Sequence, residues 1–219
     1  MENKKIDIVV TDDHKLFRKG IAALLDDIEN VDTILEAGNG VELLRLLENN
    51  ESLPNLILLD LNMPEMDGVE ATQKIRELYP DLKIIILTME DDEQLILHLI
   101  NEGINGYLNK SADPDEVELA INKVMNMDYY FPEEISKLVF SNLKKFGSDD
   151  LPQRVEFSKQ EKKVLQLMCR ELTNVEIGEQ MEISKRTVEG YRRNMISKTG
   201  VRSMAGLIVY ALKNKIVEI

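Results

Sequence analysis

The segment Leu56-Ile-Leu-Leu-Asp-Leu-Asn-Met-Pro-Glu-Met-Asp-Gly68 contains the main signal for the architecture of this chain. Its first four residues form a short apolar run, which is consistent with a strand buried on both faces. Asp60 follows directly, and Pro64 and Gly68 are residues that shape a loop. In a parallel sheet covered by helices, ligands bind beyond the carboxyl ends of the strands. The stretch therefore predicts such a sheet, with Asp60 at its functional edge.

Four more apolar runs flank this stretch, at Ile6 to Val10, Thr33 to Ala37, Ile84 to Leu87 and Tyr107 to Leu108. Apolar residues at helical spacing lie between the runs, for example Leu16, Gly20, Ile21, Leu24 and Ile28. Strands that alternate with amphipathic helices indicate five βα units. We predict an α/β domain over residues 1–125, with a five-stranded, parallel, doubly wound sheet.

The alternation stops near Asn126, and a different organisation follows. We predict a linker over residues 126–155, with an amphipathic helix from Glu133 to Phe146 and a turn-rich stretch at 147–152. Residues 156–219 are predicted to form a small all-α domain with helices at about 159–171, 174–181, 185–198 and 203–213. Capping-box spacing supports two of these helix starts, Ser158 to Glu161 and Thr173 to Glu176, and Ser184 is a third candidate N-cap.

The formal net charge of −13 is unevenly distributed. Residues 1–125 hold 11 Lys and Arg against 27 Asp and Glu, whereas residues 156–219 hold 12 against 8. Because Lys and Arg drive binding to phosphate backbones, only the C-terminal part favours DNA. The single cysteine, Cys169, excludes an internal disulfide, and its apolar neighbours indicate a packed side chain. No apolar run approaches the roughly 20 residues needed to span a bilayer, and the polar N-terminal residues lack the hydrophobic stretch of a signal peptide, so we expect a cytoplasmic protein with no membrane partner.

Polar residues follow four of the predicted strands: Asp12 and Asp13, Asp60, Thr88, and Lys110. Three carboxylates that converge repel one another unless a cation joins them, and an all-oxygen site suits Mg²⁺. A metal, a hydroxyl and an ammonium around one carboxylate would help it to accept a phosphoryl group. Asp60 is therefore the predicted nucleophile.

These residues, together with Tyr107, resemble the receiver domain of two-component response regulators over residues 4–125. The resemblance implies a flavodoxin-like fold in which Asp13, Asp60 and the backbone carbonyl of Asn62 hold Mg²⁺ and Asp12 acts through water. It also implies that Thr88 and Lys110 contact the phosphoryl group and that Tyr107 turns inward as the domain switches. Met89 departs from the family pattern, because a small residue usually follows the Thr, and a long side chain could crowd the site.

The C-terminal helices at 174–181 and 185–198 are separated by Glu182-Ile-Ser184, the short connection of a helix-turn-helix. The second helix of that motif lies in the major groove, and here it contains the most basic segment of the chain. Exposed Lys, Arg and Asn side chains on it would contact phosphates and base edges. Close approach of its backbone to DNA would explain Gly190, which is unfavourable in a helix interior. The candidate DNA-binding residues are Lys185, Arg186, Thr187, Glu189, Gly190, Arg192, Arg193, Asn194 and Lys198.

Residues 157–216 are similar to the LuxR-type DNA-binding domain of the NarL/FixJ response regulators, a tetrahelical fold. The match rests on Glu161, Val164-Leu165, Glu176-Ile177, Ser184, Arg186-Thr-Val188, Arg192, Lys198, Gly200-Val201 and Ser203. Glu189 stands where many members have Lys, which implies a different operator. In this family the last helix, here Ser203 to Asn214, serves dimerisation on DNA through Leu207, Ile208, Tyr210 and Ala211. Packing of that helix in a monomer core is an equal alternative.

We therefore expect a transcriptional regulator in which a sensor histidine kinase, or a small phosphodonor, phosphorylates Asp60. Phosphorylation would shift the chain to a DNA-binding, dimeric population. The chain would not be an enzyme apart from catalysing its own phosphorylation and dephosphorylation. Two alternatives stay open: a regulator or interaction module that works without phosphorylation, and a phosphatase of the haloacid dehalogenase type. The phosphatase would require a second Asp two residues after the nucleophile, where this chain has Asn62.

Overall fold

The computed structural model describes residues 5–142, 155–170, 172–214 and 216–217. The chain divides into two compact units, residues 1–92 with 106–122 and residues 93–105 with 123–219. Residues 93–105, which the sequence places within the first domain, thus group with the second unit. The predicted turn-rich stretch 147–152 lies outside the described residues.

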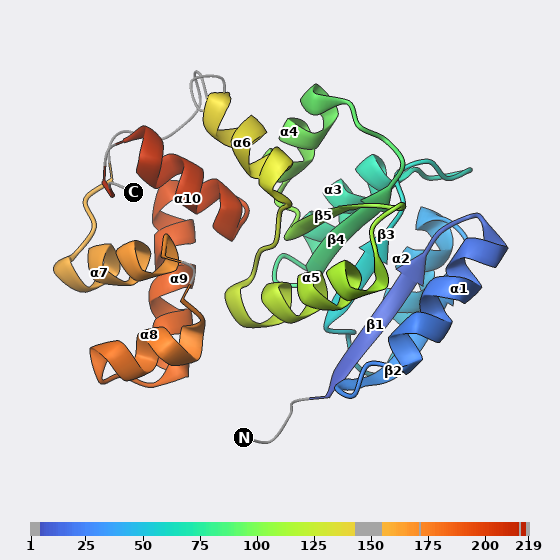
Figure 1. Cartoon of the computed structure of the whole chain (residues 1–219), viewed down its shortest axis with the longest axis horizontal. Helices are drawn as coiled ribbons and strands as arrows, with labels where there is room; N and C mark the ends of the chain where they lie inside the picture. Colours follow the sequence, from blue (N-terminus) through green and yellow to red (C-terminus); the bar gives the residue numbers. More distant parts are fainter. Residues whose placement is uncertain (1–4, 143–154, 171, 215, 218–219) are drawn as a thin grey trace. The chain divides into compact units, whose positions relative to one another are not determined.

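The first unit contains a five-stranded parallel sheet with the strand order β2-β1-β3-β4-β5 (Figure 1). The strands are β1 Ile6–Thr11, β2 Val31–Ala37, β3 Leu56–Leu59, β4 Lys83–Thr88 and β5 Gly106–Asn109. All five predicted strands are confirmed. Thr11 lies opposite Leu59 and Thr88 opposite Asn109, so the carboxyl ends of β1, β3, β4 and β5 meet on one side of the sheet. That side is where the predicted site residues follow their strands.

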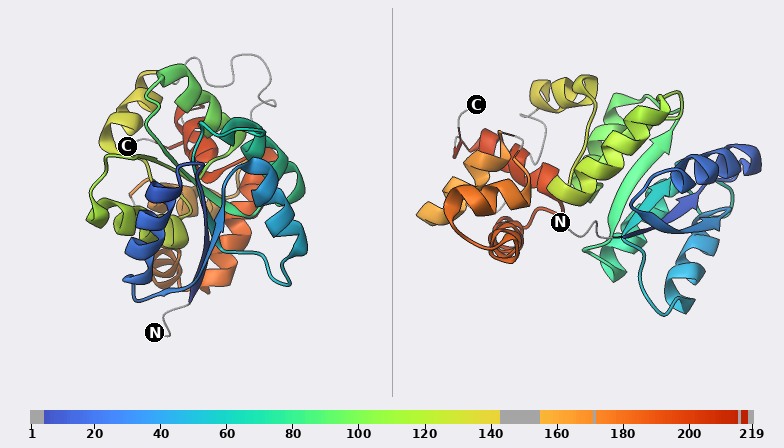
Figure 2. Two further views of the ribbon diagram at one scale, coloured as in Figure 1. Left: turned by 90° about the vertical axis from the view of Figure 1, so that its right-hand side faces the viewer. Right: turned by 60° about the horizontal axis from the view of Figure 1, so that its bottom comes forward.

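Helices cover both faces of this sheet. The strand order reverses after β2, and right-handed crossovers then place α1 Lys15–Asp26 on one face and α2 Gly40–Asn49 and α3 Gly68–Leu78 on the other (Figure 2). Residues 56–59 of β3 are almost fully buried between the two layers. This explains why β3 is a continuous apolar run with no alternating pattern.

The buried stripe of α1 does not include every apolar residue at helical spacing. Leu16 is 89% exposed, whereas Ile21 and Leu25 on the helix, and Ile28 just beyond it, are buried. These buried residues are spaced by four and three, and Leu16 lies one position off this stripe. Helical spacing in the sequence therefore predicts the helix but not which of its apolar residues are buried.

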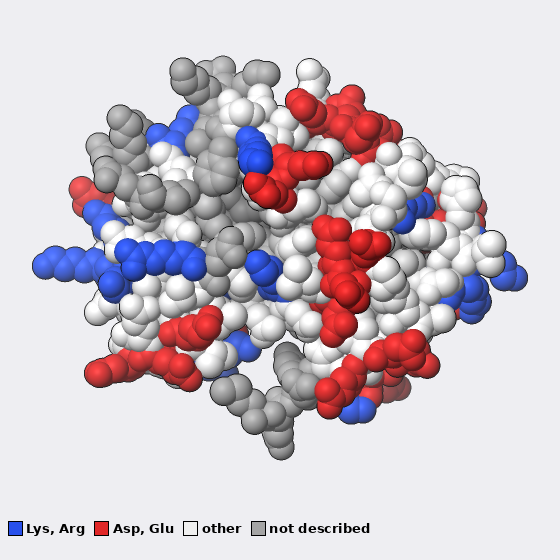
Figure 3. Space-filling model, viewed as in Figure 1, with Lys and Arg blue, Asp and Glu red and all other residues white. Residues whose placement is uncertain are grey.

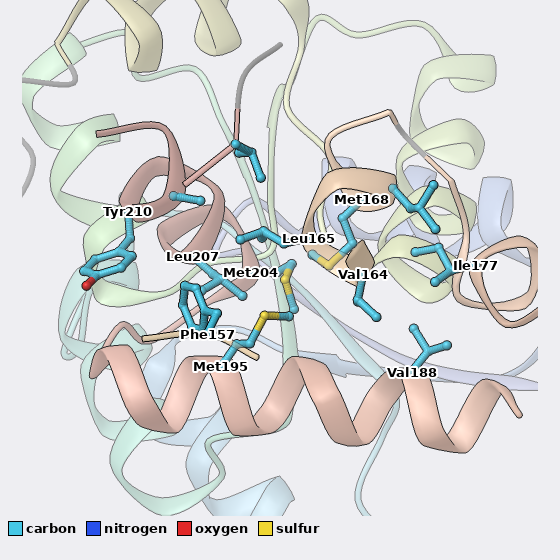
Figure 4. Close-up of a cluster of buried hydrophobic side chains, with 13 residues drawn as sticks. Phe157, Val164, Leu165, Met168, Ile177, Val188, Met195, Met204, Leu207 and Tyr210 are labelled. Carbon is cyan, nitrogen blue, oxygen red and sulfur yellow. The ribbon is translucent and has the colours of Figure 1, made fainter. Parts of the chain in front are cut away.

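The second unit is helical. Its elements are α4 Glu93–Glu102, the end of α5 Pro114–Met127, α6 Glu133–Ser141, α7 Lys159–Met168, α8 Asn174–Met181, α9 Lys185–Thr199 and α10 Met204–Lys213. Figure 4 shows the apolar side chains of α7 to α10 and Phe157 meeting in one core. The rings of Phe157 and Tyr210 meet edge to face with centroids 6.4 Å apart. The four predicted C-terminal helices are confirmed.

Local signals set the ends of these helices. Ser158 and Thr173 each form a complete capping box, with Glu161 and Glu176 as their partners. Gly200 ends α9 with a φ of 70°, a left-handed conformation that glycine adopts without strain. Among the described residues, no helix is both long and apolar enough to span a membrane.

Candidate functional site

Asp60 lies at the carboxyl end of β3 and is 3% exposed. Its backbone N–H donates to the carbonyl of Thr11 at 2.9 Å, which continues the β1–β3 pairing past the strand. One carboxylate oxygen, Oδ1, accepts from the backbone N–H of Leu61 at 2.8 Å. The other, Oδ2, accepts from Lys110 Nζ at 2.7 Å. The carboxylate is therefore held in one orientation.

The acidic pair after β1 lies beside Asp60. Asp12 is 2% exposed, and its Oδ1 accepts from the backbone N–H of His14 at 2.7 Å. The Asp13 side chain is 32% exposed, and its Oδ1 lies 2.8 Å from His14 Nδ1. One ligand atom from each of Asp12, Asp13, His14 and Asp60 lies within 4.8 Å of the others. The folding of the sheet thus brings the three carboxylates together, as the sequence predicts.

Lys110 neutralises part of this charge. Its Nζ lies 2.7 Å from Asp12 Oδ2 and 2.7 Å from Asp60 Oδ2, and its side chain is 11% exposed. Burial alone would lower the pKa of Lys110, but its hydrogen bonds and charge interactions with Asp12 and Asp60 outweigh burial and raise it. The side chain therefore stays an ammonium between the two carboxylates.

Thr88 and Tyr107 lie on β4 and β5 near the same edge. Thr88 is fully buried, and its hydroxyl oxygen accepts from the backbone N–H of Glu90 at 3.2 Å. Tyr107 is 4% exposed, and its hydroxyl donates to the carbonyl of Glu90. Burial, followed by the charges of Asp91 and Glu90, raises the pKa of Tyr107 and keeps this donor protonated. Met89, between Thr88 and Glu90, is 64% exposed.

The loop after Asp60 depends on Gly68. A Cβ at Gly68 would lie 2.2 Å from the carbonyl oxygen of Asp60, closer than any side chain can approach. The N–H of Gly68 also donates to the carbonyl of Leu61 at 2.9 Å. Gly68 therefore lets α3 begin directly against the Asp60 backbone, which is the loop-shaping role that the sequence predicts. Asn62 is exposed in this loop.

The second candidate site is a helix-turn-helix formed by α8 and α9. Glu182 ends α8 with a left-handed φ of 55°, and Ser184 caps α9 by accepting from the backbone N–H of Thr187 at 3.1 Å. A Cβ at Gly178 would lie 2.7 Å from the carbonyl of Ile183, so this turn can pack tightly only against glycine. The short connection predicted from the sequence is thus present.

Most candidate DNA-binding residues lie on accessible positions of α9. Glu189 and Gly190 are half-buried, and the exposed residues are Lys185, Arg186, Thr187, Arg193, Asn194 and Lys198. Lys198 Nζ lies 2.6 Å and 2.9 Å from the two carboxylate oxygens of Glu161 on α7. A Cβ at Gly190 would meet nothing within 4 Å in the part of the chain that the structure describes, so packing there does not explain this glycine.

The prediction that Arg192 is exposed is wrong. Arg192 is 2% exposed, and its Nη2 lies 2.8 Å from Asp128 Oδ2. It also donates to Asn174 Oδ1 and to the carbonyl of Met127. Burial lowers the pKa of Arg192, and the charge of Asp128 opposes that effect. Arg192 is therefore a structural cation inside the second unit, on the face of α9 opposite the solvent.

The last helix, α10, was expected either to form a dimer contact or to pack within the chain. Leu207, Tyr210 and Ala211 are at most 1% exposed and belong to the helical core, whereas Ile208 is half-buried. The phenolic oxygen of Tyr210 also accepts from the backbone N–H of Val155 at 3.1 Å. Three of the four residues considered for dimerisation thus pack within the chain.

The charge distribution differs between the units. Figure 3 shows patches of Asp and Glu over the elements of the sheet and long Lys and Arg side chains over the C-terminal helices, together with a smaller acidic patch there. This agrees with the division of charge along the sequence.

Sequence reasoning missed three contacts that support these sites. Phe17 places its ring centroid 4.9 Å from Lys110 Nζ, Glu161 pairs with Lys198, and Asn174 accepts from Arg192. Phe17 lies in the first turn of α1, close in sequence to Asp12 and Asp13, and this closeness could have indicated that it lies near the site. The other two contacts join different helices, and no local sequence pattern predicts them.

Comparisons with known proteins agree with this geometry. The family model described as the response regulator receiver domain matches residues 8–122. A second model, described as bacterial regulatory proteins of the luxR family, matches residues 155–211.

Whole-length relatives are also found. The chain is 30% identical to the transcriptional regulatory protein DegU of Brevibacillus brevis over 233 residues, covering 100% of this chain and 98% of DegU. It is 32% identical to the oxygen regulatory protein NreC of Staphylococcus aureus (strain JH9) over 216 residues, covering 96% and 99%. Both relatives match the two units together.

Solved structures share the fold. A LuxR-family two-component response regulator from Aurantimonas sp. SI85-9A1 is 27% identical with a TM-score of 0.58, covering 64% of this chain and 98% of that one. The RcsB response regulator of Salmonella typhimurium is 24% identical with a TM-score of 0.58, covering 95% and 99%.

Proposed function

This chain belongs to the DNA-binding response regulators that join a receiver domain to a LuxR-type domain, and we propose that phosphorylation of Asp60 controls its binding to DNA. In this proposal residues 1–125 are the receiver, residues 126–155 the linker and residues 156–219 the DNA-binding domain. The observation that carries it is the buried Asp60 carboxylate, held 2.7 Å from Lys110 Nζ and beside Asp12 and Asp13.

The proposed reaction is transfer of a phosphoryl group to Asp60 from a sensor histidine kinase or a small phosphodonor. A carboxylate oxygen of Asp60 forms a bond to phosphorus, and the bond to the donor breaks with its electron pair leaving on the donor. The Lys110 ammonium neutralises charge on the entering group, and the Thr88 hydroxyl donates a hydrogen bond to it. The chain thereby catalyses only its own phosphorylation and dephosphorylation, with Tyr107 responding as the switch residue.

The acidic cluster fits a magnesium ion. The side chains of Asp12, Asp13 and Asp60 supply carboxylate oxygens within 4.8 Å of one another, which is the hard donor set that Mg²⁺ prefers. In our proposal Asp13, Asp60 and the backbone carbonyl of Asn62 hold the ion, and Asp12 acts through water. When bound, Mg²⁺ would neutralise charge on the phosphoryl oxygens.

DNA binding is assigned to α9. We propose that this helix enters the major groove and that Lys185, Arg186, Arg193 and Asn194 contact phosphates and base edges, with Thr187, Glu189 and Gly190 on the same surface. Lys198 is the weakest member of the set because Glu161 already neutralises it. Phosphorylation would favour a homodimer that presents two such helices.

The decisive experiment is incubation of the full chain with acetyl phosphate and Mg²⁺, followed by Phos-tag electrophoresis. Wild type and the control variant Asp26→Ala, altered at an exposed position of α1, should give a shifted band. Asp60→Ala should give none, and omission of Mg²⁺ should abolish the wild-type band. An equal shift in Asp60→Ala would place the modification elsewhere. DNA binding that does not change on phosphorylation would indicate a regulator that works without it.

A further inference from the structure

We propose that Phe17 is a positioning residue for phosphoryl transfer: the face of its ring holds the Lys110 ammonium between Asp12 and Asp60. The inference rests on the proposed function and adds to the site a residue that carries neither charge nor polar atom. Its basis is a contact within the first unit, from α1 to the residue that follows β5.

The geometry is that of a cation–π contact. Lys110 Nζ lies 4.9 Å from the centroid of the Phe17 ring, inside the range of about 6 Å in which a cation is attracted to an aromatic face. The Lys110 side chain is only 11% exposed, so little water competes for the ammonium. Such contacts are strongest where the cation is desolvated.

The ring complements the other partners of Lys110. An ammonium has three N–H donors, and the structure gives two of its oxygen partners, Asp12 Oδ2 and Asp60 Oδ2, each at 2.7 Å. A further carboxylate in place of Phe17 would attract the cation but would also repel an incoming phosphoryl group. An aromatic face attracts the cation and adds no net charge to the site.

The position of the ring is itself well defined. Phe17 lies in the first turn of α1, and its neighbour Arg18 donates to the backbone carbonyl of Asp12. Arg18 Nε also donates to Glu36 Oε2 on β2 at 3.1 Å. These bonds fix the start of α1 to β1 and β2, so the ring is presented to Lys110 by a rigid part of the fold.

This arrangement has a consequence for the transfer step. Lys110 must turn from an oxygen of Asp60 toward the oxygens of the phosphoryl group that Asp60 receives. Attraction to a ring face depends weakly on the direction of the N–H bonds, so Phe17 can retain the ammonium while its hydrogen bonds are exchanged. Without the ring, Lys110 would sample orientations that do not meet the phosphoryl group.

The test weakens the negative electrostatic potential of the ring face and leaves the shape of the ring almost unchanged. Phenylalanines with one, two and three ring fluorines are introduced at position 17 of the full chain, and phosphorylation by acetyl phosphate and Mg²⁺ is timed. Each fluorine weakens the negative face, so the rate should fall stepwise, to about 2- to 10-fold below wild type for the trifluoro residue. Phe17→Leu should lie at or below that rate, whereas Phe17→Tyr should recover most of it.

The same fluorinated residues at Phe157, in the core of the second unit, serve as controls and should leave the rate unchanged. If the phosphorylation rate does not change with fluorination at position 17, or changes only with side-chain volume, Phe17 is a packing residue and not a positioning residue. That result would leave the proposed phosphorylation of Asp60 unaffected. If wild type itself shows no phosphorylation, the proposed function fails and the positioning role with it. The ring-current shift of the Lys110 ε-protons, absent in Phe17→Leu, would then still show whether the contact exists.

Discussion

Arg192 and Arg193 are adjacent in α9 and have opposite environments. Arg193 is exposed, whereas Arg192 is 2% exposed and paired with Asp128. A helix rotates by about 100° per residue, so neighbouring side chains point to different faces. The same residue type is therefore open to solvent, and to DNA in our proposal, at position 193, and is buried as an internal cation at position 192.

Replacing Arg193 with Ala should weaken binding to a DNA duplex. If Arg193 contacts a phosphate, the slope of log affinity against log salt should become shallower by about one, because one fewer counterion is released. Fluorescence anisotropy over a range of salt concentrations measures the slope. If wild type and Arg193→Ala bind DNA with the same affinity at every salt concentration, Arg193 does not contact DNA.

Replacing Arg192 with Ala should instead destabilise the second unit. The substitution leaves the Asp128 carboxylate without its buried cation and removes the donors to Asn174 and Met127, which should cost about 2–3 kcal/mol of unfolding free energy. Urea denaturation measures the change. Arg193→Ala, an exposed substitution, should stay within about 0.5 kcal/mol of wild type. Equal stability of the two variants would contradict the structural role of Arg192.

At the scale of the helix, α9 carries a glycine that its own packing does not require. Gly190→Ala should stabilise the chain by about 0.5–1 kcal/mol, because alanine favours the helix and its Cβ meets open space. If the α9 backbone approaches DNA at this point, the same substitution should weaken DNA binding. Gly20→Ala in α1 is the matched control, since its Cβ also meets open space. The Gly20→Ala variant should be more stable than wild type and should bind DNA with unchanged affinity. If Gly190→Ala also binds DNA with wild-type affinity, the α9 backbone does not approach DNA closely at this position.

Helices α7 and α9 are joined by Glu161 and Lys198. Burial would raise the pKa of Glu161, but its hydrogen bonds to Lys198 and Ser158 outweigh burial and lower the pKa below 4.5. A carboxylate with a lowered folded-state pKa contributes stability above its unfolded pKa, and loses it as pH falls through the folded pKa. The second unit should therefore lose stability below about pH 4.5.

Glu161→Gln should flatten this acid dependence. Urea midpoints measured between about pH 7 and pH 3 should converge for wild type and variant at the acidic end, because the protonated Glu161 no longer pairs with Lys198. If the urea midpoints of wild type and Glu161→Gln fall in parallel over the whole pH range, other carboxylates cause the loss of stability in acid.

At the scale of the whole molecule, phosphorylation should change assembly and DNA binding together. The full chain treated with acetyl phosphate and Mg²⁺ should sediment as a dimer and bind its operator more tightly than the untreated chain. Asp60→Ala should remain unchanged in both measurements. A treated chain that is fully phosphorylated but sediments as before would show that dimerisation does not carry the signal.

Much of the architecture follows from local patterns. The apolar runs specify the five strands, and the capping boxes at Ser158 and Thr173 specify where α7 and α8 begin, because both signals depend on neighbouring residues. The grouping of Asp12, Asp13, Asp60 and Lys110 also follows, since the ends of adjacent parallel strands must meet at one edge.

Which faces these elements bury depends on packing between segments that are distant in the sequence. The exposure of Leu16, the burial of Arg192 and the packing of Leu207 and Tyr210 depend on the exact rotation of each helix against its neighbours. The placement of Phe17 over Lys110 joins residues 93 positions apart in the chain. Periodicity determines that a helix has an apolar stripe, but contacts between distant segments determine which side chains lie within it.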